Sequence, residues 1–433
     1  MAKTRQIYNI WSLNVSEAPA TGFSYSDYNN IRHNRSDLTV FDNNLVYPIE
    51  RVNSFQYSLD IQRDNVAQLG SRDLIRRPIV NRPFISCSFG YYLVDIRNEK
   101  SLGFVVNYPD MTGTPILSEE ICCLRNFTGA ETDSRNLYLA INPSSNEDIN
   151  NRISNPFVSG ANISASGLYV MGFGNAYLTS YSVSASVGSF PQASVNYICN
   201  NILVTSSGSG ARIPAVYPKS GNLVNDATFV IPRSETNSRL SVVRPKDIMI
   251  QILDTGFAET NDGFFAISSS GIAAQSFDMK LTLNRDDMRS IGYVMPLDRR
   301  INFPIFADIG LSVIVGDNKT VNLSDIVRQD NTYNLLISMY NNNCITNITG
   351  KTMAIQYKIN NACLNRVSYS YDINSKLLAN FNFTSEIDMT RQKGLFISGT
   401  LNIPTPDFPY DFLLLESNKT GFLFTEDDNL LII

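Results

Sequence analysis

The sequence contains a single histidine, His33, within the polar stretch Asn29–Asn34. Serine–histidine and cysteine–histidine catalysis need a histidine that a third group holds in place, and an asparagine-rich stretch is poorly suited to this. One histidine also excludes histidine-rich metal sites. Phosphate loops and dinucleotide fingerprints are absent, since Gly172-Phe173-Gly174 lacks a third glycine and a following helix. We therefore predict no enzyme, no metal site and no cofactor.

Charged residues are also scarce. They make up 17% of the chain, with 35 basic against 40 acidic side chains and a net charge of −5. A protein that grips nucleic acid advertises a basic surface, and this composition does not. A protein that touches DNA without holding it would have such a composition, and so would an ordinary, slightly acidic soluble protein.

Long apolar runs and metal-type cysteine pairs are missing. No run approaches the length of a membrane span, so we expect no membrane association. The basic start is followed by Asn9, Ser12, Asn14 and Glu17 instead of an apolar signal core. The six cysteines lack C-x-x-C spacing, and most lie in apolar stretches. Buried free thiols and assembly in a reducing cytoplasm are the interpretation that this favours.

Three pairs of adjacent acids are candidates for glycoside hydrolysis, which uses two carboxyl groups across a sugar. They are Glu119 with Glu120, Asp286 with Asp287, and Asp427 with Asp428. Adjacent acids point in different directions on a helix and to opposite faces on a strand. A solvated surface is therefore the better interpretation of all three pairs.

Strand-forming residues are abundant, and they follow the same plan twice. Hydrophobic residues make up 43% and aromatic residues 11% of a chain rich in Asn, Ser and Thr, which suits strands and turns. The segment Ser54–Asp64 returns as Ser276–Asp286: both open with Ser-Phe, alternate apolar and polar residues, and close on Arg-Asp. Each copy continues to a glycine, an arginine pair and a proline. These residues are Gly70, Arg76, Arg77 and Pro83, then Gly292, Arg299, Arg300 and Pro304.

Three later matches keep the same order along the chain. They are Leu117–Ile121 with Leu323–Ile326, Asn136–Ile141 with Asn334–Met339, and Asn175–Leu178 with Asn361–Leu364. The offset between copies falls from 222 residues to 206, 198 and 186, so the first copy holds about 36 extra residues in its connections. Surface loops tolerate such growth at small entropic cost. Coincidence among Ser- and Asn-rich strands is the alternative to a duplication.

The repetition predicts a mainly β fold of two tandem β-sandwich, barrel-forming domains, each with a short helix. Ser118 is expected to cap a helix that runs through Leu124, and Ser324–Val327 a shorter one, because a hydroxyl and early acidic residues suit a helix start. The predicted plan is an N-terminal arm (1–44), a first domain with a long loop insert (45–211), a bridging segment (212–246), a second domain (247–388) and a C-terminal extension (389–433).

The repeated Arg-Asp pairs are the best polar candidates for a specific role. Arg63 with Asp64 and Arg285 with Asp286 each end the same strand, so each pair is a candidate for an equivalent ion pair with the next domain around a ring. The alternative is a strand-ending surface pair that contributes less than about 1 kcal/mol.

The order of elements in each copy resembles the tail-tube family of tailed bacteriophages. In that family a β-sandwich domain flanked by a helix contributes hairpins to a closed barrel around the DNA channel. The resemblance implies channel-facing hairpins near 45–61 with 83–97 and 168–187 with 193–204. In the second copy it implies hairpins near 267–283 with 303–315 and 353–373 with 378–388. Members with two such domains form three-membered rings, and barrel closure removes exposed sheet edges.

The resemblance implies a structural virion protein, assembled in the host cytoplasm, whose homotrimeric rings stack into a hollow tail tube for DNA ejection. Its partners would be other copies of itself, other tail proteins and DNA that passes non-specifically through the lumen. One alternative is another tail component, such as a baseplate, tail-completion or neck ring. Others are a β-rich receptor- or glycan-binding virion protein and a tail-associated glycosidase.

Overall fold

The computed structural model describes residues 9–17, 46–66, 69, 75–79, 83–107, 121–127, 134–142, 169–205, 211–224, 228–229, 242–254, 265–266, 273–314, 332–341, 352–370, 378–388, 393–399, 422–424 and 430–432. The chain divides into two units, 1–401 and 402–433. In its described part the second unit is one antiparallel hairpin, β22 (Phe422–Phe424) with β23 (Leu430–Ile432). The first unit is mainly β and holds everything that follows.

Among the described residues the first half of this unit contains nine strands before residue 206, and alternating apolar residues give the longer ones a core face. They are β1 (Asn9–Glu17), β2 (Val46–Ile49), β3 (Val52–Asp60), β4 (Phe84–Tyr92), β5 (Val106–Asn107), β6 (Arg135–Asn142), β7 (Tyr169–Ser186), β8 (Gln192–Cys199) and β9 (Asn201–Thr205). The short strands β10 (Ala211–Arg212) and β11 (Thr228–Phe229) pair with each other after them.

The second half contains ten strands among the described residues. They are β12 (Ile248–Asp254), β13 (Phe265–Ala266), β14 (Ala273–Thr282), β15 (Arg285–Met288), β16 (Asp298–Ile301), β17 (Ile305–Ile314), β18 (Thr332–Asn341), β19 (Thr352–Ser370), β20 (Leu378–Ile387) and β21 (Gly394–Gly399). A short 3-10 helix, Pro245–Asp247, leads into β12.

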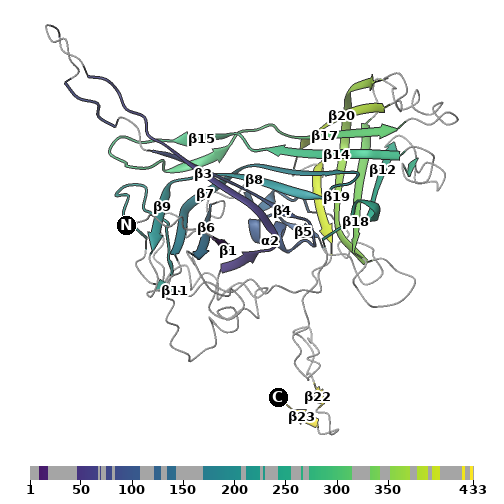
Figure 1. Ribbon diagram of the computed structural model, residues 1–433, viewed down its shortest axis with the longest axis horizontal. Helices are drawn as coiled ribbons and strands as arrows, with labels where there is room; N and C mark the ends of the chain where they lie inside the picture. Colours follow the sequence, from purple (N-terminus) through teal and green to yellow (C-terminus); the bar gives the residue numbers. More distant parts are fainter. Residues whose placement is uncertain are drawn as a thin grey trace, which may run out of the picture. The chain divides into compact units, whose positions relative to one another are not determined.

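Six antiparallel pairings of the first half recur in the second. In the first half β1 pairs with β6, β6 with β7, β7 with β8, β8 with β4, β4 with β3, and β9 with β7. In the second half β12 pairs with β18, β18 with β19, β19 with β20, β20 with β17, β17 with β14, and β21 with β19 (Figure 1). The offsets of 222, 198 and 186 residues hold in these registers. Apart from Ile121, the 206-residue match lies outside the described residues.

One long strand in each half changes its partner strands along its length. β7 pairs with β6 and β9 in its first part and with β8 in its second, and β19 likewise passes from β18 and β21 to β20. The change occurs at a bulge where Asn175 and Asn361 have positive φ angles of 47° and 56°. Asparagine tolerates this left-handed conformation better than most residues do. Tyr169–Ser186 therefore form one strand across the bulge.

The predicted helix from Ser118 to Leu124 is wrong over its described part. Residues 121–124 form a turn that leads into the 3-10 helix Arg125–Phe127, because the backbone of Cys123 bonds to Val105 and Leu395 on neighbouring segments. The α-helix among the described residues of this half is α2 (Arg97–Leu102), which ends at Gly103 with φ 105°. Residues 118–120 and the expected second helix at Ser324–Val327 lie outside the described residues.

Burial and strand pairing bear on several other predictions. Part of the expected N-terminal arm is strand β1, whose Leu13 and Val15 are buried in the core. Strand β21, assigned to the extension, pairs with β19 as β9 pairs with β7. Cys87, Cys122, Cys123 and Cys199 are buried free thiols as predicted, whereas Cys363 is exposed. The predicted domain limits themselves stay a prediction.

Candidate assembly interface

The two halves of the first unit are joined edge to edge by strands β7 and β14. Seven residues of β14 pair antiparallel with β7, ending with Thr282 opposite Ser180. The backbone N–H of Leu283 donates to the carbonyl oxygen of Thr179 at 2.8 Å and extends the junction. The sheet of the first half therefore continues into the second without a break, and one hydrophobic core lies behind it.

Within the 17-stranded sheet of the described residues, a run of eight strands crosses the junction in the order β3, β4, β8, β7, β14, β17, β20, β19. Its two edges are β3 and the last part of β19, residues 364–370. Among the described strands, β3 pairs with β4 alone and residues 364–370 pair with β20 alone. Both edges thus retain unused backbone donors and acceptors.

Strand β3 is exposed where its counterpart β14 is buried. Tyr57 and Leu59 point to the core side of β3 and are 49% and 45% exposed. The equivalent residues of β14, Met279 and Leu281, are 1% and 0% exposed because β7 and its core cover them. The same strand therefore leaves half of its apolar surface in water when no neighbouring strand is present.

The last part of β19 shows the complementary difference. Tyr369 is 56% exposed and Val367 is partly exposed. Their counterparts in β7, Val183 and Tyr181, are fully buried beneath β14. The two edges, β3 and the last part of β19, thus correspond to the two strands of the β7–β14 junction. Neither edge has a paired neighbour on its free side among the described strands.

Arg285, one of the predicted site residues, spans the junction inside the chain. Its Nε donates to the carbonyl oxygen of Leu178 on β7 at 2.7 Å, and its Nη1 donates to the carbonyl oxygen of Arg299 at 2.8 Å. The guanidinium also lies 5.4 Å from the centre of the Tyr177 ring. The bond to Leu178 and the contact with Tyr177 thus reach the first half, and the expected ion pair with the next domain around a ring stays a prediction.

Arg63 occupies the same place in the first half, but among the described residues its hydrogen bond stays within its own hairpin. Its Nη1 donates to the carbonyl oxygen of Arg77 at 3.2 Å, the counterpart of the Arg285–Arg299 bond. Figure 1 shows this hairpin, in purple, extending beyond β3. Asp64 and Asp286 are exposed, and Asp286 lies opposite Arg300 across the β15–β16 hairpin. The structure does not bring Arg63 and Asp64 together with Arg285 and Asp286.

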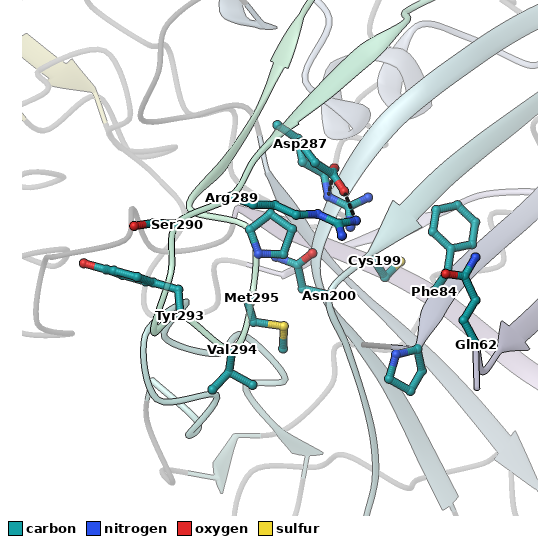
Figure 2. A pocket seen from close by; sticks show the side chains of 13 residues that line it. Gln62, Phe84, Cys199, Asn200, Asp287, Arg289, Ser290, Tyr293, Val294 and Met295 are labelled. Carbon is teal, nitrogen blue, oxygen red and sulfur yellow. Dashed lines mark hydrogen bonds and ion pairs between the residues drawn. The ribbon is translucent and has the colours of Figure 1, made fainter. Parts of the chain in front are cut away.

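A pocket of about 280 Å³ is lined in part by the connection between β15 and β16, including Arg289, Tyr293 and Met295 (Figure 2). Asp287 holds two guanidinium groups there: Arg289 Nη2 lies 2.9 Å from its Oδ2, and Arg299 Nε lies 3.3 Å from its Oδ1. Burial lowers the pKa of Arg299. Cys199 also lines the pocket, and burial raises the pKa of its thiol, so it is a poor nucleophile. The two guanidinium groups balance the negative charge of Asp287, so the arrangement is a structural ion-pair cluster.

A buried acid links α2 to both halves. Glu99 is fully buried, and its Oε1 accepts hydrogen bonds from the hydroxyls of Tyr91 at 2.9 Å and Tyr181 at 3.0 Å. The Tyr181 hydroxyl lies 2.8 Å from that of Tyr357, which belongs to β19 in the second half. Burial raises the pKa of Glu99 to about 7, and burial also raises the pKa of all three tyrosines. No sequence signal identified this network, since its members are far apart in the chain.

Most of the residues considered for catalysis in the sequence are not described by the structure. His33, Glu119, Glu120, Asp427 and Asp428 lie outside the described residues. Within the described ranges, no group of three His, Cys, Asp or Glu side chains is placed to hold a metal ion. The described helices include none that is long and apolar enough to cross a membrane.

No protein-family model and no curated protein sequence matches this chain. Two solved structures are similar over 35% of it, each at 13% identity. One is a chain of the anti-feeding prophage baseplate, solved by cryo-electron microscopy with six-fold symmetrisation, with a TM-score of 0.23 and 92% of its length covered. The other is the crystal structure of Hcp protein, with a TM-score of 0.21 and 98% of its length covered. At these scores the functional conclusion has to rest on the strand pairing.

Proposed function

We propose that this chain is a structural virion protein of a tailed bacteriophage, and that three copies close into a ring. The main support for this proposal is the β7–β14 junction together with the unpaired edges of β3 and β19. A strand edge with half-exposed apolar residues is a template for another strand. Because β3 corresponds to β14 and β19 to β7, the junction within the chain can be repeated between chains.

Repetition of one head-to-tail junction gives a ring when the rotation between units closes. Each chain supplies eight strands of continuous sheet, so three chains supply 24 (3 × 8). Barrels of this size leave a channel instead of a packed interior. The number of three chains comes from the resemblance of the sequence to double-domain tail-tube proteins, which place six domains around the channel.

The face of this sheet opposite the core supports passage of DNA through the ring. In the first half its strands carry mainly hydroxyl and amide groups: Ser86, Ser88, Ser180, Ser182, Ser184, Gln192, Ser194 and Asn196. In the second half the central strands carry Asp278, Lys280, Asp308 and Glu386 at such positions. Such a surface offers few cations for phosphate groups, so DNA would slide without being held. Rings would stack into a hollow tail tube with other tail proteins at its ends.

Negative-stain microscopy together with native mass spectrometry of the purified protein tests this proposal. We expect a trimer mass and hollow tubes of stacked rings. Isolated rings that never stack would favour a baseplate, tail-completion or neck component. A protein that remains monomeric across the micromolar range would overturn the proposal.

A further inference from the structure

The junction inside the chain specifies how the two free edges would align. In β3 and β4 Phe55 lies opposite Phe89, and in β14 and β17 Phe277 lies opposite Leu311, so β3 maps onto β14 with an offset of 222. The bulge after Leu178 in β7 recurs after Leu364 in β19, which gives an offset of 186. Every pair of the internal junction therefore has a defined counterpart between two chains.

We propose that β3 of one copy adds antiparallel to residues 366–370 of the next copy, with Asp60 directly opposite Arg366. This register follows from the internal pair of Thr282 with Ser180. It also places Ser58 opposite Ser368 and Tyr57 opposite Tyr369. The inference rests on the proposed function, and it names the residues through which one copy recognises the next.

The opposite charges of Asp60 and Arg366 are a second argument for this register, besides the correspondence of β3 with β14 and of β19 with β7. The internal junction carries two hydroxyls at this position, whereas the free edges carry opposite charges. Asp60 and Arg366 are both exposed, and neither side chain contacts an ion-pair partner among the residues the structure describes. Opposite charges directly across an antiparallel pair stabilise it, and like charges destabilise it.

The same charges disfavour pairing of identical edges. The segment Val52–Asp60 contains no basic residue, and residues 363–370 contain no acidic one. Pairing of β3 with another β3, or of β19 with another β19, thus leaves both charges without an opposite partner. The edges accept each other head to tail, which is the direction that a ring requires.

Arg63 extends the junction beyond Asp60. Its counterpart Arg285 donates to the carbonyl oxygen of Leu178, and the equivalent acceptor in the next copy is the carbonyl oxygen of Leu364. Tyr177, which Arg285 covers, corresponds to the exposed Cys363. Arg63, whose described hydrogen bond stays within its own hairpin, thus has a defined acceptor on the neighbouring chain.

Charge exchange tests the register. We expect Asp60→Arg and Arg366→Asp each to lower the assembled fraction about tenfold or more, because each places like charges in opposition. The double variant Asp60→Arg/Arg366→Asp restores the opposite pair, and we expect assembly within about threefold of wild type. Glu386→Arg is the matched control: it makes the same charge change on β20, which pairs on both sides within the chain.

The assembled fraction is measured by sedimentation velocity, with circular dichroism to show that each variant folds. Single variants that assemble like wild type, or a folded double variant that is not restored, would overturn the register while leaving ring assembly intact. Wild-type protein that stays monomeric would overturn the proposed function and this inference with it. If a charge variant does not fold, Ser58→Cys with Ser368→Cys replaces it. An oxidised crosslink between chains supports the register, and its absence in assembled protein opposes it.

Discussion

The hydroxyl oxygens of Tyr181 and Tyr357 lie 2.8 Å apart although the two residues belong to different halves of the chain. Tyr181 also donates to Glu99, so a fully buried carboxyl group is connected to both halves through one hydroxyl. The other carboxyl oxygen, Oε2, has no hydrogen-bond partner in the described part of the chain. Such a group is costly to bury in its charged form.

This network makes the stability of the fold depend on pH. Burial raises the pKa of Glu99 from 4.5 to about 7 in the folded chain. The stability that the protonated group contributes is fully present below about pH 4.5 and is lost as the pH rises through about 7. We expect Glu99→Gln to gain on the order of 3 kcal/mol relative to wild type between pH 4.5 and pH 8.

Urea unfolding of both proteins at several pH values measures this difference. Glu386→Gln serves as the control, because its carboxyl group is exposed on the polar face of β20. Curves for wild type and Glu99→Gln that stay parallel across the range would show that folding does not raise the pKa of Glu99.

The two equivalent leucines of β3 and β14 give a matched comparison of packing. Leu281 is fully buried at the internal junction, so we expect Leu281→Ala to destabilise the isolated chain by about 2–5 kcal/mol. Leu59 is 45% exposed, and Leu59→Ala should cost less than about 1 kcal/mol before assembly. Chemical denaturation at submicromolar concentration makes the comparison. Equal losses would mean that the edge of β3 is already covered within one chain.

The two arginines that end these strands should separate folding from assembly. Arg285→Ala removes two charge-assisted hydrogen bonds and the contact with Tyr177, so we expect a loss of about 2 kcal/mol in the isolated chain. Arg63→Ala removes one exposed bond to Arg77 and should leave the isolated chain nearly unchanged, while it weakens ring formation. Thermal unfolding and sedimentation are measured on both variants. Arg63→Ala with wild-type assembly would contradict a role for Arg63 between chains.

Alternation and repetition allowed the strands and their correspondence to be predicted from the sequence. The Ser-Phe strands, the asparagines at 175 and 361 and the offsets of 222, 198 and 186 residues all recur in the registers. The helix at 118–124 was wrong over 121–124, since capping residues are a local signal and Cys123 bonds to distant strands instead. Burial of Glu99 and the β7–β14 junction depend on which edges meet, and local patterns do not encode this.

Asn175 and Asn361 offer a similar comparison at the bulges. Both have positive φ angles, and both backbone N–H groups donate to an asparagine side chain, at 3.2 Å from Asn136 and 3.0 Å from Asn334. Asn175 Oδ1 additionally accepts a hydrogen bond from the backbone N–H of Val216 at 2.9 Å. We therefore expect Asn175→Ala to cost about 1 kcal/mol more than Asn361→Ala, as measured by denaturant midpoints. Equal costs would mean that the bond to Val216 contributes nothing net.

Cys363 reports directly on whether the free edge of β19 becomes covered. It is exposed in the single chain, whereas its counterpart Tyr177 lies beneath Arg285 and Arg299, at 5.4 Å and 5.8 Å. In the proposed ring the corresponding arginines of the next copy would cover Cys363 in the same way. In a Cys344→Ser background we expect a maleimide to label Cys363 rapidly in dilute protein and at least about tenfold more slowly after assembly. Equal rates in trimers and monomers would show that the chains meet through another surface, because thiol access depends on what lies over the sulfur.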